Sequence, residues 1–147
     1  MFKRSQTDFT TCLMLNYRNI DQKHTIKLLG VWITEDLTWQ KNTQEICRKA
    51  YTRIPMLTKL KYVGIGREDL LTIYKLFIRS CVEYCSVVFH SGLTKHQSNM
   101  IERTQRVSLK GILASEYTDY LSALGICKIS SLSKRREKSL RFQYKST

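Results

Sequence analysis

Apolar residues between positions 10 and 34 come in two short runs that are rich in strand-forming residues. The first run covers residues 12–15 and the second covers residues 26–33. The turn-prone residues Asn16, Asn19 and Asp21 lie between them. This pattern predicts an N-terminal β-hairpin. Because two strands alone cannot bury a face, we expect the hairpin to depend on a neighbouring unit.

From Thr38 onward the apolar residues follow a helical period instead. They recur every three or four positions, at Trp39, Ile46, Ala50, Ile54 and Leu57. Thr38 is a candidate N-cap, and Pro55 is expected to kink the helix or end its first half. Residues 67–90 show the strongest helical pattern. Since they are apolar on most sides, we expect this second helix to be the central one.

Glycines and capping residues mark the ends of the remaining predicted elements. Gly92 ends the second helix, and Thr94 with Gln97 forms a capping box that opens a third helix toward Ala114. A short amphipathic segment over 117–124 ends at Gly125, and a basic helix covers roughly 131–144. The expected fold is mainly α, with an N-terminal β-hairpin followed by a bundle of about four to five helices. The hairpin occupies residues 1–36 and the basic helical domain residues 37–147.

The charge of the chain lies almost entirely in the helical part. The 147 residues carry 25 Lys and Arg against 12 Asp and Glu, a net charge of +13. Residues 37–147 hold 20 of those bases and 8 of those acids, a net charge of +12. Such an excess predicts a polyanionic partner rather than any particular fold.

Basic side chains follow helix faces in a way that suits contacts with phosphates. The first helix and its exit, the third helix and the last helix supply the candidates, which are Arg48, Lys49, Arg53, Lys59, Lys61, Arg103, Arg106, Lys110, Arg135 and Arg136. The alternative for each row is an ordinary solvated face. Trp32, Trp39, Tyr51 and Tyr62 could stack on bases, although core packing is the usual role of such residues.

No catalytic or metal-binding pattern occurs in the chain. It contains no HExxH, no phosphate-binding glycine loop and no adjacent aspartates, so neither an enzyme nor a bound cofactor is expected. Cys81 and Cys85 are one helical turn apart on an apolar helix and fit core thiols better than metal ligands.

The compartment is predicted from the cysteines and from the apolar runs. Five scattered cysteines indicate a reducing compartment, nucleus or cytoplasm, rather than a disulfide framework. The first residues lack the apolar core of a secretory signal. Charged residues interrupt the longest apolar run, so no membrane span is expected.

One string of residues resembles a known family. Lys27-Leu28-Leu29-Gly30-Val31-Trp32-Ile33 resembles the K-x-L-G-V block that closes the palm of non-LTR (LINE-type) retrotransposon reverse transcriptases. Leu37-Thr38-Trp39 follows it, as in that family. Further blocks resemble the family's thumb and post-thumb region, so that the resemblance covers about residues 10–145; they are residues 69–75, 82–94, 101–106, 117–120 and 133–137.

The resemblance implies a ligand and also a missing activity. Lys27 to Ile33 would lie near a primer end, and the helices over 38–62 and 67–90 would follow a template–primer duplex of RNA, DNA or their hybrid. The family's catalytic carboxylates lie in upstream palm motifs, and nothing before Lys27 resembles them. The expectation is therefore a non-catalytic fragment with weak, salt-dependent, sequence-independent binding. Pro55 and Gly66 depart from the family pattern.

Residues 58–95 also resemble the short N-terminal helical family of the eighth AlkB homologue, a tRNA-modifying protein. The chain has no HxD…H iron triad and no glycine-rich cofactor loop, so oxygenase or methyltransferase chemistry does not follow from this resemblance. Two alternatives stay open: a helical protein-interaction module, and a pseudogene-like product without selected function.

Overall fold

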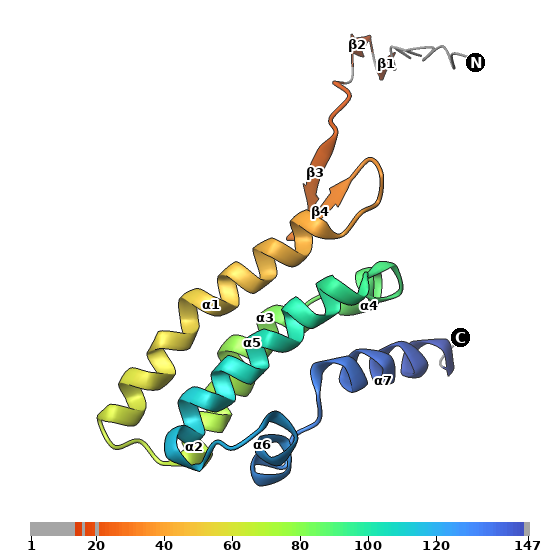
Figure 1. The fold of residues 1–147 in the computed structure, drawn as a ribbon. Helices are drawn as coiled ribbons and strands as arrows, with labels where there is room; N and C mark the ends of the chain where they lie inside the picture. The colour runs from red at the N-terminus through yellow and green to blue at the C-terminus, as the bar shows by residue number, and fades with distance from the viewer. Residues whose placement is uncertain (1–13, 16, 20, 146–147) are drawn as a thin grey trace, which may run out of the picture.

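The computed structural model describes residues 14–15, 17–19 and 21–145. It is 71% helical, with β-hairpins before the helices, which confirms the predicted mainly α class (Figure 1). The strands are β1 (Met14–Leu15), β2 (Arg18–Asn19), β3 (Thr25–Leu28) and β4 (Val31–Thr34). The helices are α1 (Gln40–Tyr62), α2 (Arg67–Ile73), the π-helical η1 (Tyr74–Arg79), α3 (Ser80–Glu83), α4 (Ser86–Phe89), η2 (His90–Gly92), α5 (Lys95–Leu113), η3 (Ala114–Glu116), α6 (Tyr120–Cys127) and α7 (Leu132–Lys145).

The strand pairing differs from the predicted hairpin. β1 pairs antiparallel with β2, and β3 pairs antiparallel with β4, so two separate two-stranded units replace the pairing of the first run with the second. The run over 26–33 folds back on itself because Leu29 and Gly30 have φ of 47° and 87°, the two positive values of a type I′ turn. Cys12 and Leu13 of the predicted first strand lie outside the described residues.

Helix α1 runs from Gln40 to Tyr62, so Pro55 does not end it, and Thr38 is not its N-cap. Trp39 is the N-cap residue, and the Thr38 hydroxyl donates instead to Asp36 Oδ1 at 3.0 Å. Pro55 lies inside the helix, which continues to Tyr62. Proline removes one backbone hydrogen bond, but the buried residues Ile54 and Leu57 pack the helix against its neighbours on both sides of that position.

The predicted second helix is broken and is not the central one. Its middle part is π-helical over η1, and Cys85 has a φ of 51°, which separates α3 from α4. Leu76, Phe77 and Val88 are exposed, so the apolar surface of this segment is only partly covered. The central helix is α5, which packs against α1, α2, α6 and α7.

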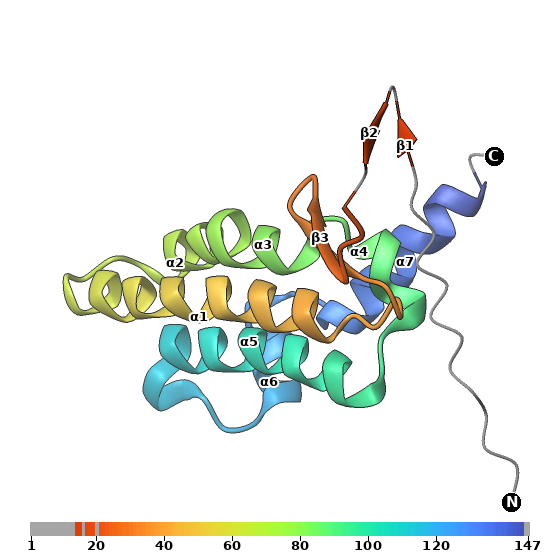
Figure 2. The same cartoon turned by 90° about the horizontal axis from the view of Figure 1, so that it is seen from above.

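The helices α1, α2–α3 and α5 lie alongside one another, and α6 and α7 cover the remaining side of α5 (Figures 1 and 2). The predicted capping box is present: Gln97 N donates to Thr94 Oγ1 at 3.2 Å, and Thr94 N donates to Gln97 Oε1 at 2.8 Å. Fully buried apolar residues from all these helices form one core, among them Leu57, Leu70, Ile101, Leu109 and Leu132.

A polar network joins α5 to the C-terminal helices. Glu102 accepts hydrogen bonds from the backbone N–H groups of Leu132 and Ser133, both at 3.1 Å, so its carboxylate lies at the N-terminus of α7. Tyr120 donates its hydroxyl hydrogen to the same carboxylate. Gln105, fully buried, accepts from Tyr74 and donates to the Ser130 carbonyl. These contacts fix where α6 and α7 lie.

Candidate nucleic-acid interface

The clearest row of cations lies on α5. Arg103, Arg106 and Lys110 follow at i, i+3 and i+7, so they share one side of the helix, and all three are exposed. No carboxylate among the described residues forms an ion pair with any of the three. The Arg106 guanidinium lies 5.0 Å from the centre of the Tyr120 ring, which holds it at the surface. Their charge is therefore available to a ligand.

A second set of cations lies on the outer side of α1. Arg48 and Lys59 are exposed and eleven residues apart, three helical turns along the same side. Arg48 pairs with Glu45 at 3.0 Å, and the hydrogen bond that Arg48 donates lowers the pKa of the Glu45 carboxyl. Because the Arg48 side chain remains 63% exposed, a phosphate could replace Glu45 as its partner.

Tyr51 of α1 lies near the row on α5. It lies on α1, and Arg103 on the adjacent α5 is close enough to oppose the rise in the Tyr51 pKa that burial causes. The two helices run side by side (Figures 1 and 2). We name the α1–α5 face the surface formed by Arg48, Lys59, Arg103, Arg106 and Lys110. Cations spaced along two adjacent helices match the repeated phosphates of a nucleic-acid backbone.

Lys49 and Arg53 lie on a different flank of α1, where they line a groove of about 450 Å³ between α1 and α3. Gly30 of the β3–β4 turn and Tyr84 close one end of it, and the Tyr84 hydroxyl donates to the Leu29 carbonyl at 2.8 Å. Arg53 donates to the Phe77 carbonyl within the π-helical turn and to Cys81 Sγ. Arg53 thus has partners within the protein, whereas Lys49 adds an ammonium to the groove.

Lys27 is exposed on β3, beside an aromatic ring. Its Nζ lies 5.5 Å from the centre of the Trp32 ring, and Lys41 Nζ lies 4.0 Å from the same centre. The half-buried Trp32 therefore joins two cations at the start of α1. Lys41 was not among the predicted site residues. Its position seven residues before Arg48, on the same side of the helix, is the signal in the sequence that would have identified it.

Three predicted residues serve mainly internal contacts. Lys61 donates to the Ile112 carbonyl near the end of α5. Arg135 pairs with Glu83, to which its Nη2 donates at 3.0 Å. Arg136 is only 1% exposed; its Nη2 donates to Ser98 Oγ at 2.9 Å, and burial lowers the pKa of its guanidinium. As a surface phosphate contact, Arg136 is therefore a wrong prediction, because Leu132, one turn earlier, marks that side of α7 as buried.

The predicted cations thus divide into separate groups rather than one site. Arg48, Lys59, Arg103, Arg106 and Lys110 share the α1–α5 face, Lys49 and Arg53 line the groove, and Lys27 lies at the hairpin. Among residues 14–15, 17–19 and 21–145, no three His, Cys, Asp or Glu side chains gather where they could hold a metal ion. Within the same part of the chain, no helix is both long and apolar enough to cross a membrane.

The chain matches no protein-family model, no curated protein and no solved structure. The resemblance to LINE-type reverse transcriptases therefore depends on the residues that carry it, above all Lys27 to Ile33.

Proposed function

We propose that this chain is a non-catalytic nucleic-acid-binding module related to the thumb and connector of LINE-type reverse transcriptases. The α1–α5 face binds the backbone of a template–primer duplex weakly and without regard to sequence. The observation that carries this proposal is the exposed row of Arg103, Arg106 and Lys110 on α5, none of which forms an ion pair with a carboxylate among the described residues. Arg48 and Lys59 add two exposed cations on the neighbouring helix.

The chemistry of the face favours phosphate over base recognition. Guanidinium and ammonium groups on rigid helices provide charge at fixed spacings, and binding is driven largely by the release of counterions from the nucleic acid. Arg106 is held against Tyr120 and Arg48 against Glu45, so these groups are positioned before binding. We expect micromolar or weaker affinity and a steep dependence on salt.

The hairpin contributes a second contact near the start of α1. Lys27 and Lys41 lie beside the Trp32 ring, and the β3–β4 turn contacts Tyr84 at the end of the groove. In a complex, these two ammonium groups would extend the line of charge from the α1–α5 face toward the hairpin. Residues 27–33 resemble a block that lies near the primer end in the LINE-type family, and this resemblance supports the same order of contacts.

The test is a fluorescence titration of a labelled RNA–DNA hybrid duplex at about 50 mM and about 200 mM salt. The variant R103A/K110A removes two charges from the α1–α5 face, and R18A/K23A removes two exposed charges from elsewhere as a matched control. We expect only the first variant to reduce the salt slope, by about two, because each lost phosphate contact removes about one. No binding by the unaltered protein at low salt would overturn the proposal.

A protein-interaction module is the second candidate, and exposed apolar residues favour it. Leu29 is 82% exposed and Tyr84 53%, and the two are joined by a hydrogen bond at the end of the groove. Phe77, on the helical segment beside it, is 53% exposed. A partner captured by the unaltered protein, retained at high salt after nuclease treatment and lost in a Phe77→Ser variant, would support this alternative.

A further inference from the structure

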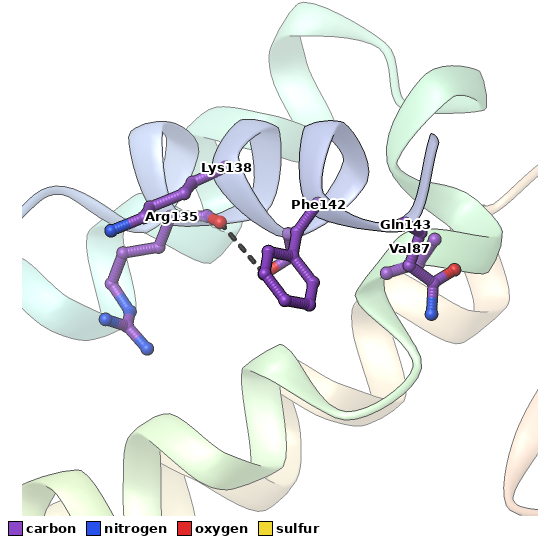
Figure 3. A pocket seen from close by; sticks show the side chains of 6 residues that line it. Val87, Arg135, Lys138, Phe142 and Gln143 are labelled. Atoms are coloured by element: carbon purple, nitrogen blue, oxygen red, sulfur yellow. Dashed lines mark hydrogen bonds between the residues drawn. The ribbon is translucent and has the colours of Figure 1, made fainter. Parts of the chain in front are cut away.

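Helix α7 and the short helix α4 line a second, open groove of about 440 Å³ that lies apart from the α1–α5 face. It is lined by Val87 from α4 and, from α7, by Arg135, Lys138, Ser139, Phe142 and Gln143. In Figure 3 the Phe142 ring points away from α7 into this groove, with Arg135 and Lys138 toward one end. The ring is 77% exposed, which is a large apolar surface to leave uncovered on a basic helix.

A row of cations runs along α7 beside this ring. Lys134, Lys138, Arg141 and Lys145 follow at i, i+4, i+7 and i+11, so they fall on one side of the helix, and all four are exposed. None of them forms an ion pair with a carboxylate in the described part of the chain. Phe142 lies four residues after Lys138 and three before Lys145, directly next to the row. The one acid of α7, Glu137, falls on the side of the row away from Phe142.

We propose that this groove binds unpaired nucleic acid, with one base stacked on Phe142 and the backbone following the row of cations. An exposed aromatic ring beside regularly spaced cations is the arrangement by which proteins bind single strands without sequence preference. Around the ring, Arg135, which is paired with Glu83, and Gln143 give the groove a polar rim. The Ser139 hydroxyl donates to the Arg135 carbonyl at 3.1 Å and can accept a hydrogen bond from a base.

The same features disfavour a membrane surface as the ligand. A helix that lies on a bilayer presents a broad apolar face to the lipid. On α7 that face is turned into the protein, where Leu132 is fully buried and Leu140 half-buried. Of the side chains that line the groove, only Phe142 and Val87 are apolar, and burying Arg135, Lys138 and Gln143 in lipid would be costly. A single base covers the Phe142 ring and leaves those polar groups in water.

The experiment compares three probes on the full chain: labelled oligo(dT) of about 12 nucleotides, a hybrid duplex, and vesicles of phosphatidylserine and phosphatidylcholine. Phe142→Ala should weaken oligo(dT) binding by about 5- to 150-fold, the range that corresponds to 1–3 kcal/mol for one stacked base. Duplex binding should stay unchanged, because Phe142 is outside the α1–α5 face. Phe142→Trp should keep oligo(dT) affinity, and its added indole fluorescence should be quenched by the stacked base.

The outcomes separate this site from the duplex site. Loss of oligo(dT) binding in Phe142→Ala, with duplex binding intact, supports the groove. Loss of duplex binding in R103A/K110A with oligo(dT) binding intact also supports two separate sites. Equal oligo(dT) affinity for Phe142→Ala and the unaltered protein, or binding of the vesicles but not of oligo(dT), overturns the proposal. Because Phe142 is exposed, circular dichroism should show the same fold for both variants.

Discussion

The Arg106 guanidinium lies 5.0 Å from the centre of the Tyr120 ring, and the Tyr120 hydroxyl donates to the carboxylate of Glu102. Glu102 in turn accepts hydrogen bonds from the first backbone N–H groups of α7. The surface cation for which we propose nucleic-acid binding thus contacts the same tyrosine that joins α5 to the C-terminal helices. Burial, and then the hydrogen bond to Glu102, raise the pKa of Tyr120.

Replacing Tyr120 by Phe tests this support. The variant keeps the ring under Arg106 but removes a hydroxyl that also accepts from Gln105 Nε2 at 3.0 Å. We expect Y120F to lower the free energy of unfolding by about 1–3 kcal/mol, because buried polar partners lose a hydrogen bond, with little effect on duplex affinity. Urea unfolding followed by circular dichroism measures the free energy of unfolding, and a duplex titration measures the affinity. An unchanged free energy of unfolding would mean that the Tyr120 hydroxyl does not contribute to the stability of the fold.

Replacing Pro55 by Ala should stabilise the protein. Proline in a helix interior costs about 3 kcal/mol relative to alanine, and Pro55 is exposed within the uninterrupted α1. We expect P55A to raise the free energy of unfolding by about 1–3 kcal/mol, since the variant restores the N–H that can donate to the Tyr51 carbonyl. Thermal unfolding of both proteins gives the answer. A lower melting temperature for P55A would show that α1 needs a distortion at this position.

Replacing Leu29 by Asn should stabilise the β3–β4 hairpin. Leu29 has a φ of 47° and is 82% exposed, so it bears the strain of a left-handed conformation without burying its side chain. Asparagine adopts this conformation readily in type I′ turns. We expect L29N to add about 1 kcal/mol of stability. Gly30→Ala is the opposite control: the Gly30 φ is 87°, and an added Cβ would lie 3.4 Å from Tyr84 Cε1, so this variant should lose stability.

The Cys47 thiol should react slowly in the folded protein. Burial raises its pKa to about 11, and the side chain is 3% exposed. Iodoacetamide at pH 8.5, followed by peptide mass spectrometry, should label the half-buried Cys81 before Cys47 and label both rapidly in urea. Equal labelling rates in the folded protein would contradict the buried position of Cys47.

The same thiol predicts a loss of stability at alkaline pH. Above about pH 9 the unfolded chain releases the Cys47 proton, whereas the folded protein keeps it until about pH 11. The unfolded state therefore binds fewer protons in this window, and stability falls as the pH rises through it. The raised pKa values of Tyr74 and Tyr120 act in the same direction. The decline between pH 9 and 11 should accordingly be smaller in C47A than in the unaltered protein, and an equal decline would contradict this assignment.

Local hydrogen-bonding chemistry made some elements predictable from the sequence. Thr94 and Gln97 form the expected capping box because its donors and acceptors are only three residues apart. The basic helix over 131–144 and the third helix also agree with their periodicity. In each case the information lies within one turn or one face of the element itself.

Features that depend on distant contacts could not be predicted in this way. A strand over 26–33 folds back because Leu29 takes a left-handed conformation that its residue type disfavours. The break at Cys85 and the π-helical turn at η1 lie in a segment that packs against α1, and the helical period of residues 67–90 does not indicate either one. Whether a cation such as Arg103 is exposed or one such as Arg136 is buried follows from the neighbouring helices and not from charge.

The most direct test of the central claim is duplex binding by the α1–α5 face. The unaltered protein, R103A/K110A and the matched control R18A/K23A are titrated against the same labelled RNA–DNA hybrid at about 50 mM and about 200 mM salt. We expect the unaltered protein to bind measurably at the lower salt concentration and much more weakly at the higher one, with affinity and salt slope reduced only in R103A/K110A. Equal losses in both variants, or no binding by the unaltered protein, would contradict it.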